Sequence, residues 1–228
     1  MTDVLDTLTR CPLLAGLPPE ALAQAAKLAT VRDFAENQTM YSKGSSPKTL
    51  VVIQSGAVRV NTVSRAGKEL TLMICGPDNW FGDAVFWPES PRLLGAVAHE
   101  DTRIIEFASD SFMALLAAFP QCYPVIIQQL GLRLRAALMV IEDDALRGIP
   151  ARLARRLLFI AAFQYGRTDH PVSLRLTQEQ LGTMLGITRQ ATQRAMQLLV
   201  AKELVELRYG SILLSDPAGL ETFIAADE

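Results

Sequence analysis

The spacing of apolar residues changes once along this chain, and the change limits what the chain can fold into. From about Phe34 to Phe107 the residues form short alternating runs such as "AVRVNTVS", in which Val58 and Val60 share one face. The segment "RAGKE" at 65–69 has the composition of a hairpin turn between two such runs. Several short strands at close spacing predict a small antiparallel β-barrel or sandwich. Helical spacing replaces this pattern from about Gln121, so the sequence predicts an α+β fold.

A long helix is predicted from Gln121 to Leu146, where apolar residues recur at helical spacing. The 3-4-3-4 spacing of a coiled-coil seam is followed by Ile127, Leu130, Leu134, Ala137 and Ile141. Further apolar groups lie off that seam, which predicts a helix covered on more than one side. One side could pack on the chain's own barrel and the other on a second copy. The alternative is a helix in the core of a monomer.

Composition excludes several classes of protein. The chain has 228 residues, a net charge of -2 and 50% hydrophobic residues, which is ordinary for a globular protein and does not exclude a local DNA-binding face. Cys11, Cys75 and Cys122 are too far apart in sequence for a disulfide framework or a zinc motif. The N-terminus lacks the pattern of a signal peptide, and Arg133 and Arg135 interrupt the most apolar run. We therefore expect a cytoplasmic protein without a membrane partner.

Two short helices are predicted near the C-terminus, joined by a glycine turn. Thr177 and Gln180 have the spacing of a capping box, Gly186 permits a tight turn, and Thr188 can cap the second helix. That helix would bury Ala191, Ala195, Leu198 and Leu199 and expose Arg189, Gln190, Gln193 and Arg194. "LVELRYGSILLS" predicts a hairpin with Gly210 in its turn. The pattern is that of a winged helix-turn-helix, whose second helix enters the major groove of DNA.

The segment "LTQEQLGTMLGITRQATQRAMQLLVAKELV" resembles the DNA-binding module of the cyclic-AMP receptor and fumarate-nitrate regulator (CRP/FNR) family. "IQSGAVRV" and "NWFGDAVFW" resemble the glycine-rich signatures of that family's barrel. The resemblance implies an effector-sensing, cyclic-nucleotide-binding-like jelly-roll barrel at 1–120, a dimerisation helix at 121–147 and a winged helix-turn-helix at 148–228. It also implies a homodimer on a palindromic double-stranded DNA operator, with RNA polymerase as a partner if the protein is an activator.

The chemistry of the recognition helix agrees with that resemblance. Arginine can pair with guanine and glutamine with adenine through two hydrogen bonds each. Thr177, Gln178 and Thr188 lie at predicted helix starts, where phosphates can be held. Gln190 stands where the family usually has glutamate, so the operator sequence cannot be carried over from relatives.

The effector site departs from the pattern of cyclic-AMP-binding relatives. In "FGDAVFWPESPRLLGAV", Gly82 is present, and Arg92 is either a phosphate ligand or a surface arginine. Asp83 replaces the usual glutamate, and Leu93 replaces the usual serine. The threonine-serine pair that meets the adenine becomes Ala137 and Leu138, and an unpaired polar base edge costs roughly 1–3 kcal/mol. The expected pocket residues are Gly82, Asp83, Arg92, Leu134 and Leu138, and cyclic AMP is not the expected ligand.

Other effectors remain open. Haem is possible, with His99, Cys75 or Met73 as ligands, whereas an iron-sulfur cluster would need more N-terminal cysteines than Cys11. An unidentified ligand could lie among Trp80, Phe86, Trp87 and Leu134, or the protein could act without a ligand. The two histidines lie in different predicted domains and there is no base beside a nucleophilic serine, so the sequence predicts no enzyme and no metal site. The rival function is a ligand-binding barrel that does not bind DNA.

Overall fold

The computed structural model describes residues 2–46, 48–65, 67, 69–87, 89–165 and 170–227. The chain divides into two compact units, Met1–Gly67 with Ile74–Arg135 and Lys68–Met73 with Ala136–Glu228. The boundary falls inside the long helix α4 (Tyr123–Leu146), so each half of this helix belongs to a different unit. In the predicted hairpin turn at 65–69, Ala66 and Lys68 lie outside the described residues.

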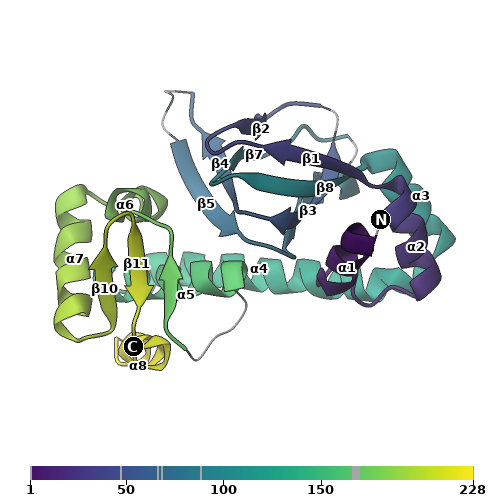
Figure 1. Cartoon of the computed structure of the whole chain (residues 1–228). Helices are drawn as coiled ribbons and strands as arrows, with labels where there is room; N and C mark the ends of the chain where they lie inside the picture. The colour runs from purple at the N-terminus through teal and green to yellow at the C-terminus, as the bar shows by residue number, and fades with distance from the viewer. Residues whose placement is uncertain are drawn as a thin grey trace. The chain divides into compact units, whose positions relative to one another are not determined.

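The strands of the N-terminal half form two antiparallel four-stranded sheets (Figure 1). The first has the order β1-β8-β3-β6 and the second the order β2-β7-β4-β5. Their bounds are β1 Thr30–Phe34, β2 Thr39–Tyr41, β3 Thr49–Ser55, β4 Val58–Val63, β5 Glu69–Cys75, β6 Trp80–Phe81, β7 Gly95–Ala98 and β8 Thr102–Ala108. Among the described residues the two sheets share no strand, so they do not close into one continuous barrel; the fold is jelly-roll-like, as the resemblance implies. Both sheets carry buried apolar side chains, among them Ile53 in the first and Val60 in the second.

The helices of this unit complete its core. They are α1 (Thr2–Arg10), α2 (Pro19–Leu28), the 3₁₀ turn η1 (Asp83–Phe86), α3 (Ser109–Ala118) and the 3₁₀ turn η2 (Pro120–Cys122). β3 pairs with β8 and β6 and is buried from Leu50 to Ile53, as a strand covered on both faces requires. Phe107 of β8 meets Phe112 of α3 with ring centroids 5.9 Å apart. One continuous cluster of buried residues therefore joins the first sheet to the helices.

The second unit is a three-stranded sheet surrounded by helices (Figure 1). Its sheet has the order β10-β11-β9, from β9 (Val172–Leu174), β10 (Val205–Arg208) and β11 (Ser211–Leu214). Its helices are α5 (Ile149–Tyr165), α6 (Gln178–Leu185), α7 (Arg189–Ala201) and α8 (Pro217–Ala225). The predicted break after α4 is confirmed, and Pro150 lies in the first turn of α5, where its missing N–H costs no helical hydrogen bond.

Helix α4 carries a stripe of exposed apolar side chains. Ile127, Leu134, Leu138 and Ile141 are 67%, 63%, 57% and 64% exposed. Their spacing of seven, four and three residues keeps them on one face of the helix. The expected seam is shifted at one position, because Leu130 is partly buried and packs on the core of its own unit. The stripe therefore includes Leu138 and not Leu130, while Ala137 is exposed beside it.

By length and composition alone, the helical stretch Pro120–Leu146 could cross a membrane. However, polar side chains in both halves of this helix contact other protein groups. The guanidinium of Arg133 lies over the Trp80 ring, 3.3 Å from its centroid, and donates a hydrogen bond to the Trp80 carbonyl. In the other half, Asp143 is buried in an ion pair with Arg147. What remains to be covered is the apolar stripe, not the whole surface of the helix.

Candidate nucleic-acid interface

Two capped helices and a glycine turn build the helix-turn-helix, as the sequence predicts. The Thr177 hydroxyl accepts from the Gln180 N–H at 3.1 Å, and the Gln180 side chain accepts from the Thr177 N–H at 2.9 Å. This reciprocal pair begins α6. Gly186 ends the helix with φ 65°, a left-handed conformation that glycine adopts without strain. Thr188 then caps α7 by accepting from the Ala191 N–H at 3.3 Å.

Helix α7 has one buried face and one polar face. The buried side chains are Thr192, Ala195, Met196 and Leu199. The expectation for Leu198 was wrong, since it is 40% exposed, and Ala191 is only partly buried. Each residue turns about 100° around the helix axis, so position 198 lies roughly 110° away from the centre of the buried face, whereas position 199 lies on that face. Arg189, Gln190, Gln193 and Arg194 are all exposed, so the structure brings the predicted recognition residues together on the polar face.

The polar face of α7 borders a groove of about 420 Å³. The hairpin β10–β11 and the start of α6 form its other walls. The groove is lined by Leu176, Thr177, Gln178, Glu179, Arg189, Thr192, Gln193, Leu207, Arg208, Tyr209, Gly210, Ser211 and Ile212. The sequence predicts the hairpin, but Arg208, Tyr209 and Ser211 were not predicted as site residues. Their position beside Gly210, which has φ 68° in the hairpin turn, was the available signal.

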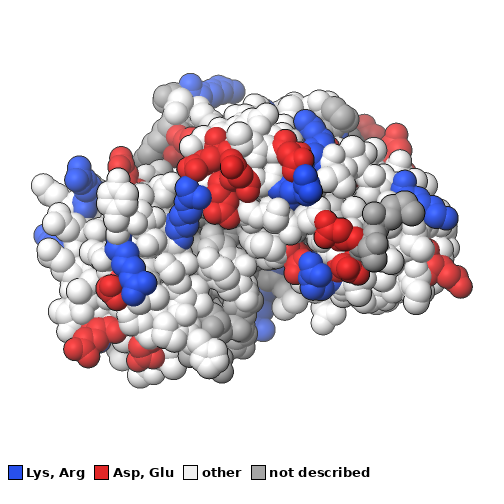
Figure 2. Space-filling model, viewed as in Figure 1, with Lys and Arg blue, Asp and Glu red and all other residues white. Residues whose placement is uncertain are grey.

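Charge is not spread evenly around this groove. Within the described part of the chain, neither Arg189 nor Arg194 has an ion pair or hydrogen bond from its side chain, whereas Arg208 is paired with Glu206. Figure 2 shows basic and acidic side chains interspersed on the face in view, in keeping with the net charge of -2. A DNA phosphate backbone would therefore contact a few individual arginine side chains and not a broad basic surface.

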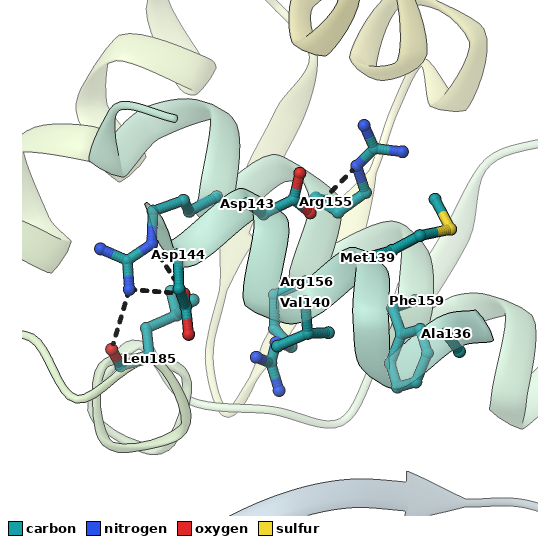
Figure 3. Close-up of a pocket in the computed structure, with 10 residues that line it drawn as sticks. Ala136, Met139, Val140, Asp143, Asp144, Arg155, Arg156, Phe159 and Leu185 are labelled. Atoms are coloured by element: carbon teal, nitrogen blue, oxygen red, sulfur yellow. Dashed lines mark hydrogen bonds and ion pairs between the residues drawn. The ribbon is translucent and has the colours of Figure 1, made fainter. Parts of the chain in front are cut away.

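A crevice of about 70 Å³ separates the end of α4 from α5 within the second unit (Figure 3). Of its lining residues, Asp143 accepts a hydrogen bond from Arg147 Nε at 2.7 Å and lies 3.3 Å from Arg155 Nε. The neighbouring Asp144 lies 2.6 Å from Arg152, which also donates to the Leu185 carbonyl at the end of α6. Two carboxylates at the end of α4 thus pair with α5, and Arg152 of α5 in turn contacts the end of α6.

Two family models match the chain. Residues 31–119 match the cyclic nucleotide-binding domain, and residues 151–223 match the Crp-like helix-turn-helix domain. The chain belongs to the CRP/FNR family of transcription regulators. This family consists of regulators and not of enzymes, in agreement with the sequence.

The similarity to individual CRP/FNR proteins extends over almost the whole chain. The CRP-like cAMP-activated global transcriptional regulator of Mycobacterium tuberculosis is 27% identical over 92% of this chain and 95% of its own length. The cyclic AMP receptor protein of Thermus thermophilus is 26% identical over the same shares. The structure of FixK2 from Bradyrhizobium japonicum superposes with a TM-score of 0.72 at 19% identity, covering 85% of this chain and 96% of that one. That last likeness concerns the fold alone.

Arg92 and Leu93, two predicted effector positions of the cyclic nucleotide-binding domain, differ in burial. Arg92 is buried, with 4% of its surface exposed, so it is not the surface arginine that was one alternative. Its guanidinium lies 3.7 Å from the centroid of the Tyr41 ring and donates to Thr49 Oγ1 at 3.1 Å. Burial lowers the pKa of Arg92. Leu93, at the position of the family's serine, is 70% exposed.

Glycine and aspartate occupy the other predicted effector positions of that domain. Gly82 has φ 95° beside the Thr49 carbonyl, where a Cβ would clash, so its role in the backbone is clear. Asp83 begins η1 and is partly exposed. Leu134 and Leu138 lie in the exposed stripe of α4, on opposite sides of the boundary between the two units.

The residues predicted to bind haem or an unidentified ligand differ in how far they are buried. His99 is buried, with Nδ1 3.4 Å from Arg59 Nη1, and Cys75 is buried, whereas Met73 is partly exposed. Trp80 is buried under Arg133, Phe86 is partly buried, and Trp87 is exposed. No group of three or more His, Cys, Asp or Glu within the described residues could hold a metal ion.

Proposed function

We propose that this CRP/FNR protein binds a palindromic DNA operator as a homodimer, with α7 of each protomer in the major groove. The observation that carries the proposal is the polar face at the start of α7. Its two arginines are exposed and take no side-chain partner within the described residues. A guanidinium left without a protein partner at the start of a recognition helix is available to a guanine edge or a phosphate.

The capping residues support a division of roles within the interface. Thr177 and Thr188 cap α6 and α7 by accepting from the N–H groups of Gln180 and Ala191, and the other N–H groups of each first turn have no acceptor within their helix. Phosphates bind at such helix starts and fix the register of a protein on DNA. Gln178 lies beside them, and Arg189, Gln190, Gln193 and Arg194 are left to contact base edges.

The apolar stripe of α4 supports the homodimer. Large apolar side chains at heptad spacing are unfavourable in water, and a second helix that covers them lowers the free energy by burying their surface. We assign the interface to Ile127, Leu134, Leu138 and Ile141, with Ala137 at its edge. Two protomers joined in this way would present two α7 helices to two half-sites about 10 base pairs apart.

We also propose that the effector is not cyclic AMP. Arg92 is already held by Tyr41 and Thr49, so binding a cyclic phosphate would require breaking those contacts. The serine that should lie beside it is an exposed leucine. If the protein is an activator, RNA polymerase is its further partner, and the cytoplasm is where both occur.

A mobility-shift assay tests DNA binding. The protein should retard a duplex selected from random DNA, and Arg189→Ala should weaken that shift at least tenfold while Arg65→Ala, at an exposed position in the first unit, should not. Calorimetry tests the effector: cyclic AMP should give no saturable heat at micromolar concentration. A dissociation constant near 1 μM, about -8 kcal/mol, would refute the second proposal. An absorption spectrum with a haem band would favour the haem alternative.

A further inference from the structure

The wing hairpin contains an ion pair on one face of a single strand. Glu206 and Arg208 are two residues apart in β10, and side chains at that spacing point to the same side of a strand. Arg208 Nε donates to Glu206 Oε1 at 3.0 Å and Nη2 donates to Oε2 at 3.1 Å. The pair raises the pKa of Arg208 and lowers the pKa of Glu206. Both side chains remain about half exposed, so water and other anions can reach them.

Arg208 also lies on the groove that the recognition helix borders. It lines this groove together with Arg189 from α7 and Thr177 from the start of α6. Next to it, Tyr209 is fully exposed at the tip of the hairpin. A DNA strand that enters the groove would bring a phosphate to the guanidinium of Arg208. Glu206, in the same β-strand as Arg208, already neutralises that guanidinium.

We propose that the Glu206 carboxylate competes with a DNA phosphate for Arg208, and so reduces the affinity of the wing for any DNA sequence. The inference rests on the proposed DNA-binding function and deepens it. In the free protein the guanidinium is held by Glu206. On DNA it turns to the phosphate, and the released carboxylate then lies near the anionic backbone. The exchange is possible because an exposed ion pair is weak in water.

The consequence is uniform across DNA sequences. A phosphate contact carries no sequence information, so a competitor for it changes specific and non-specific binding by the same factor. Each phosphate that a cation neutralises also adds about one unit to the slope of affinity against salt concentration. In wild type the Glu206 carboxylate that Arg208 leaves attracts a salt cation in its place, which offsets the cation released from the phosphate. Removing Glu206 should therefore change both quantities, and it should do so only while Arg208 is present.

The test compares wild type with Glu206→Gln, Arg208→Gln and the double variant. Binding to a selected operator duplex and to a scrambled duplex of equal length is followed by fluorescence anisotropy over a range of KCl concentrations. Glu206→Gln should tighten binding to both duplexes about two- to fivefold and steepen the salt slope by about one unit. In the Arg208→Gln background the same change should have little effect. Both side chains are half exposed, so these variants should fold, and a thermal melt confirms that.

A matched control separates the competition from a change in net charge. Glu203→Gln removes a carboxylate from an exposed position just before β10 and outside the groove lining. It should change affinity less than Glu206→Gln and leave the slope nearly unchanged. An unaltered slope in Glu206→Gln, or a gain that persists without Arg208, would overturn the inference. If wild type binds neither duplex, the proposed function fails as well; if Arg189→Ala loses the operator while Glu206→Gln changes nothing, only the competition is wrong.

Discussion

Gly182 of α6 lies directly against Thr192 of α7: a Cβ at position 182 would come within 2.5 Å of Thr192 Oγ1. Thr192 is buried and cannot swing into solvent, and its hydroxyl donates to the Thr188 carbonyl at 3.1 Å. Gly182→Ala should therefore force the two helices apart. Overpacking of this kind costs about 1–3 kcal/mol, which exceeds the roughly 1 kcal/mol that alanine gains over glycine in a helix. Thermal unfolding should show a lower Tm.

A double-mutant cycle checks the cause of that loss. Thr192→Ala removes the hydroxyl that the new methyl group would meet, so Gly182→Ala should cost less in that background than in wild type. Gly210→Ala is a useful comparison because φ at Gly210 is 68° and nothing lies within 4 Å of the new Cβ, so its cost is one of backbone conformation alone. Equal costs of Gly182→Ala in both backgrounds would show that the helices do not meet at this point.

Asp143 and Asp144 give a second pair of predictions from neighbouring positions. The Asp143 side chain is only 7% exposed and faces two arginines, Arg147 and Arg155. Asp143→Asn removes the charge of the carboxylate that both arginines face, and removing one partner of a buried ion pair costs about 3–5 kcal/mol. Asp144 is 47% exposed, so Asp144→Asn should cost less than about 1 kcal/mol. Urea unfolding of the two variants would compare them, and similar midpoints would contradict the burial of Asp143.

Leu134 tests the dimer interface. Leu134→Asp places a charge in the middle of the exposed stripe of α4, where a second copy would bury it at a cost of several kcal/mol. Sedimentation should show a monomer, and operator binding should fall because one recognition helix no longer positions the other. Gln128→Asp introduces the same charge at an exposed polar position of the same helix and should leave the dimer intact. A dimer that survives Leu134→Asp would place the interface elsewhere.

The cysteines predict a loss of stability at high pH. Burial raises the pKa of Cys11 to about 12 and of Cys75 to about 11, from 9.0. Below about pH 9 these thiols are protonated in both the folded and unfolded states. As pH rises from 9 towards 12 the unfolded chain releases protons first, so the free energy of unfolding should fall in that range. Chemical denaturation at pH 8 and pH 10 measures this, and Cys11→Ser with Cys75→Ser should reduce the difference.

Local signals explain which parts of the fold the sequence could predict. The capping box at Thr177 and Gln180, the glycine turn at Gly186 and the hairpin around Gly210 are all set within a few residues, and all are confirmed. The two sheets follow from short alternating runs. Their failure to close into a barrel depends on pairing between distant strands, which no local pattern determines.

The rest depended on tertiary packing. Helix α4 has apolar residues on several faces, so spacing alone could not decide whether Leu130 or Leu138 faces its own core. Arg92 lies in a segment rich in turn residues, yet its side chain folds back onto Tyr41 and Thr49, more than forty residues earlier in the chain. By contrast, the Glu206–Arg208 pair follows from a spacing of two in a strand, so the sequence already contained its signal.

The last prediction concerns base recognition by Gln190. If α7 enters the major groove, the Gln190 amide can both donate and accept, which suits adenine. A glutamate at this position only accepts, which suits the amino group of cytosine. Gln190→Glu should therefore shift the preference at one symmetric pair of operator positions towards cytosine. Selection of binding sites from random DNA with both proteins measures the shift. The spacing of the half-sites should not change, because the dimer sets it, and identical motifs would mean that Gln190 faces water.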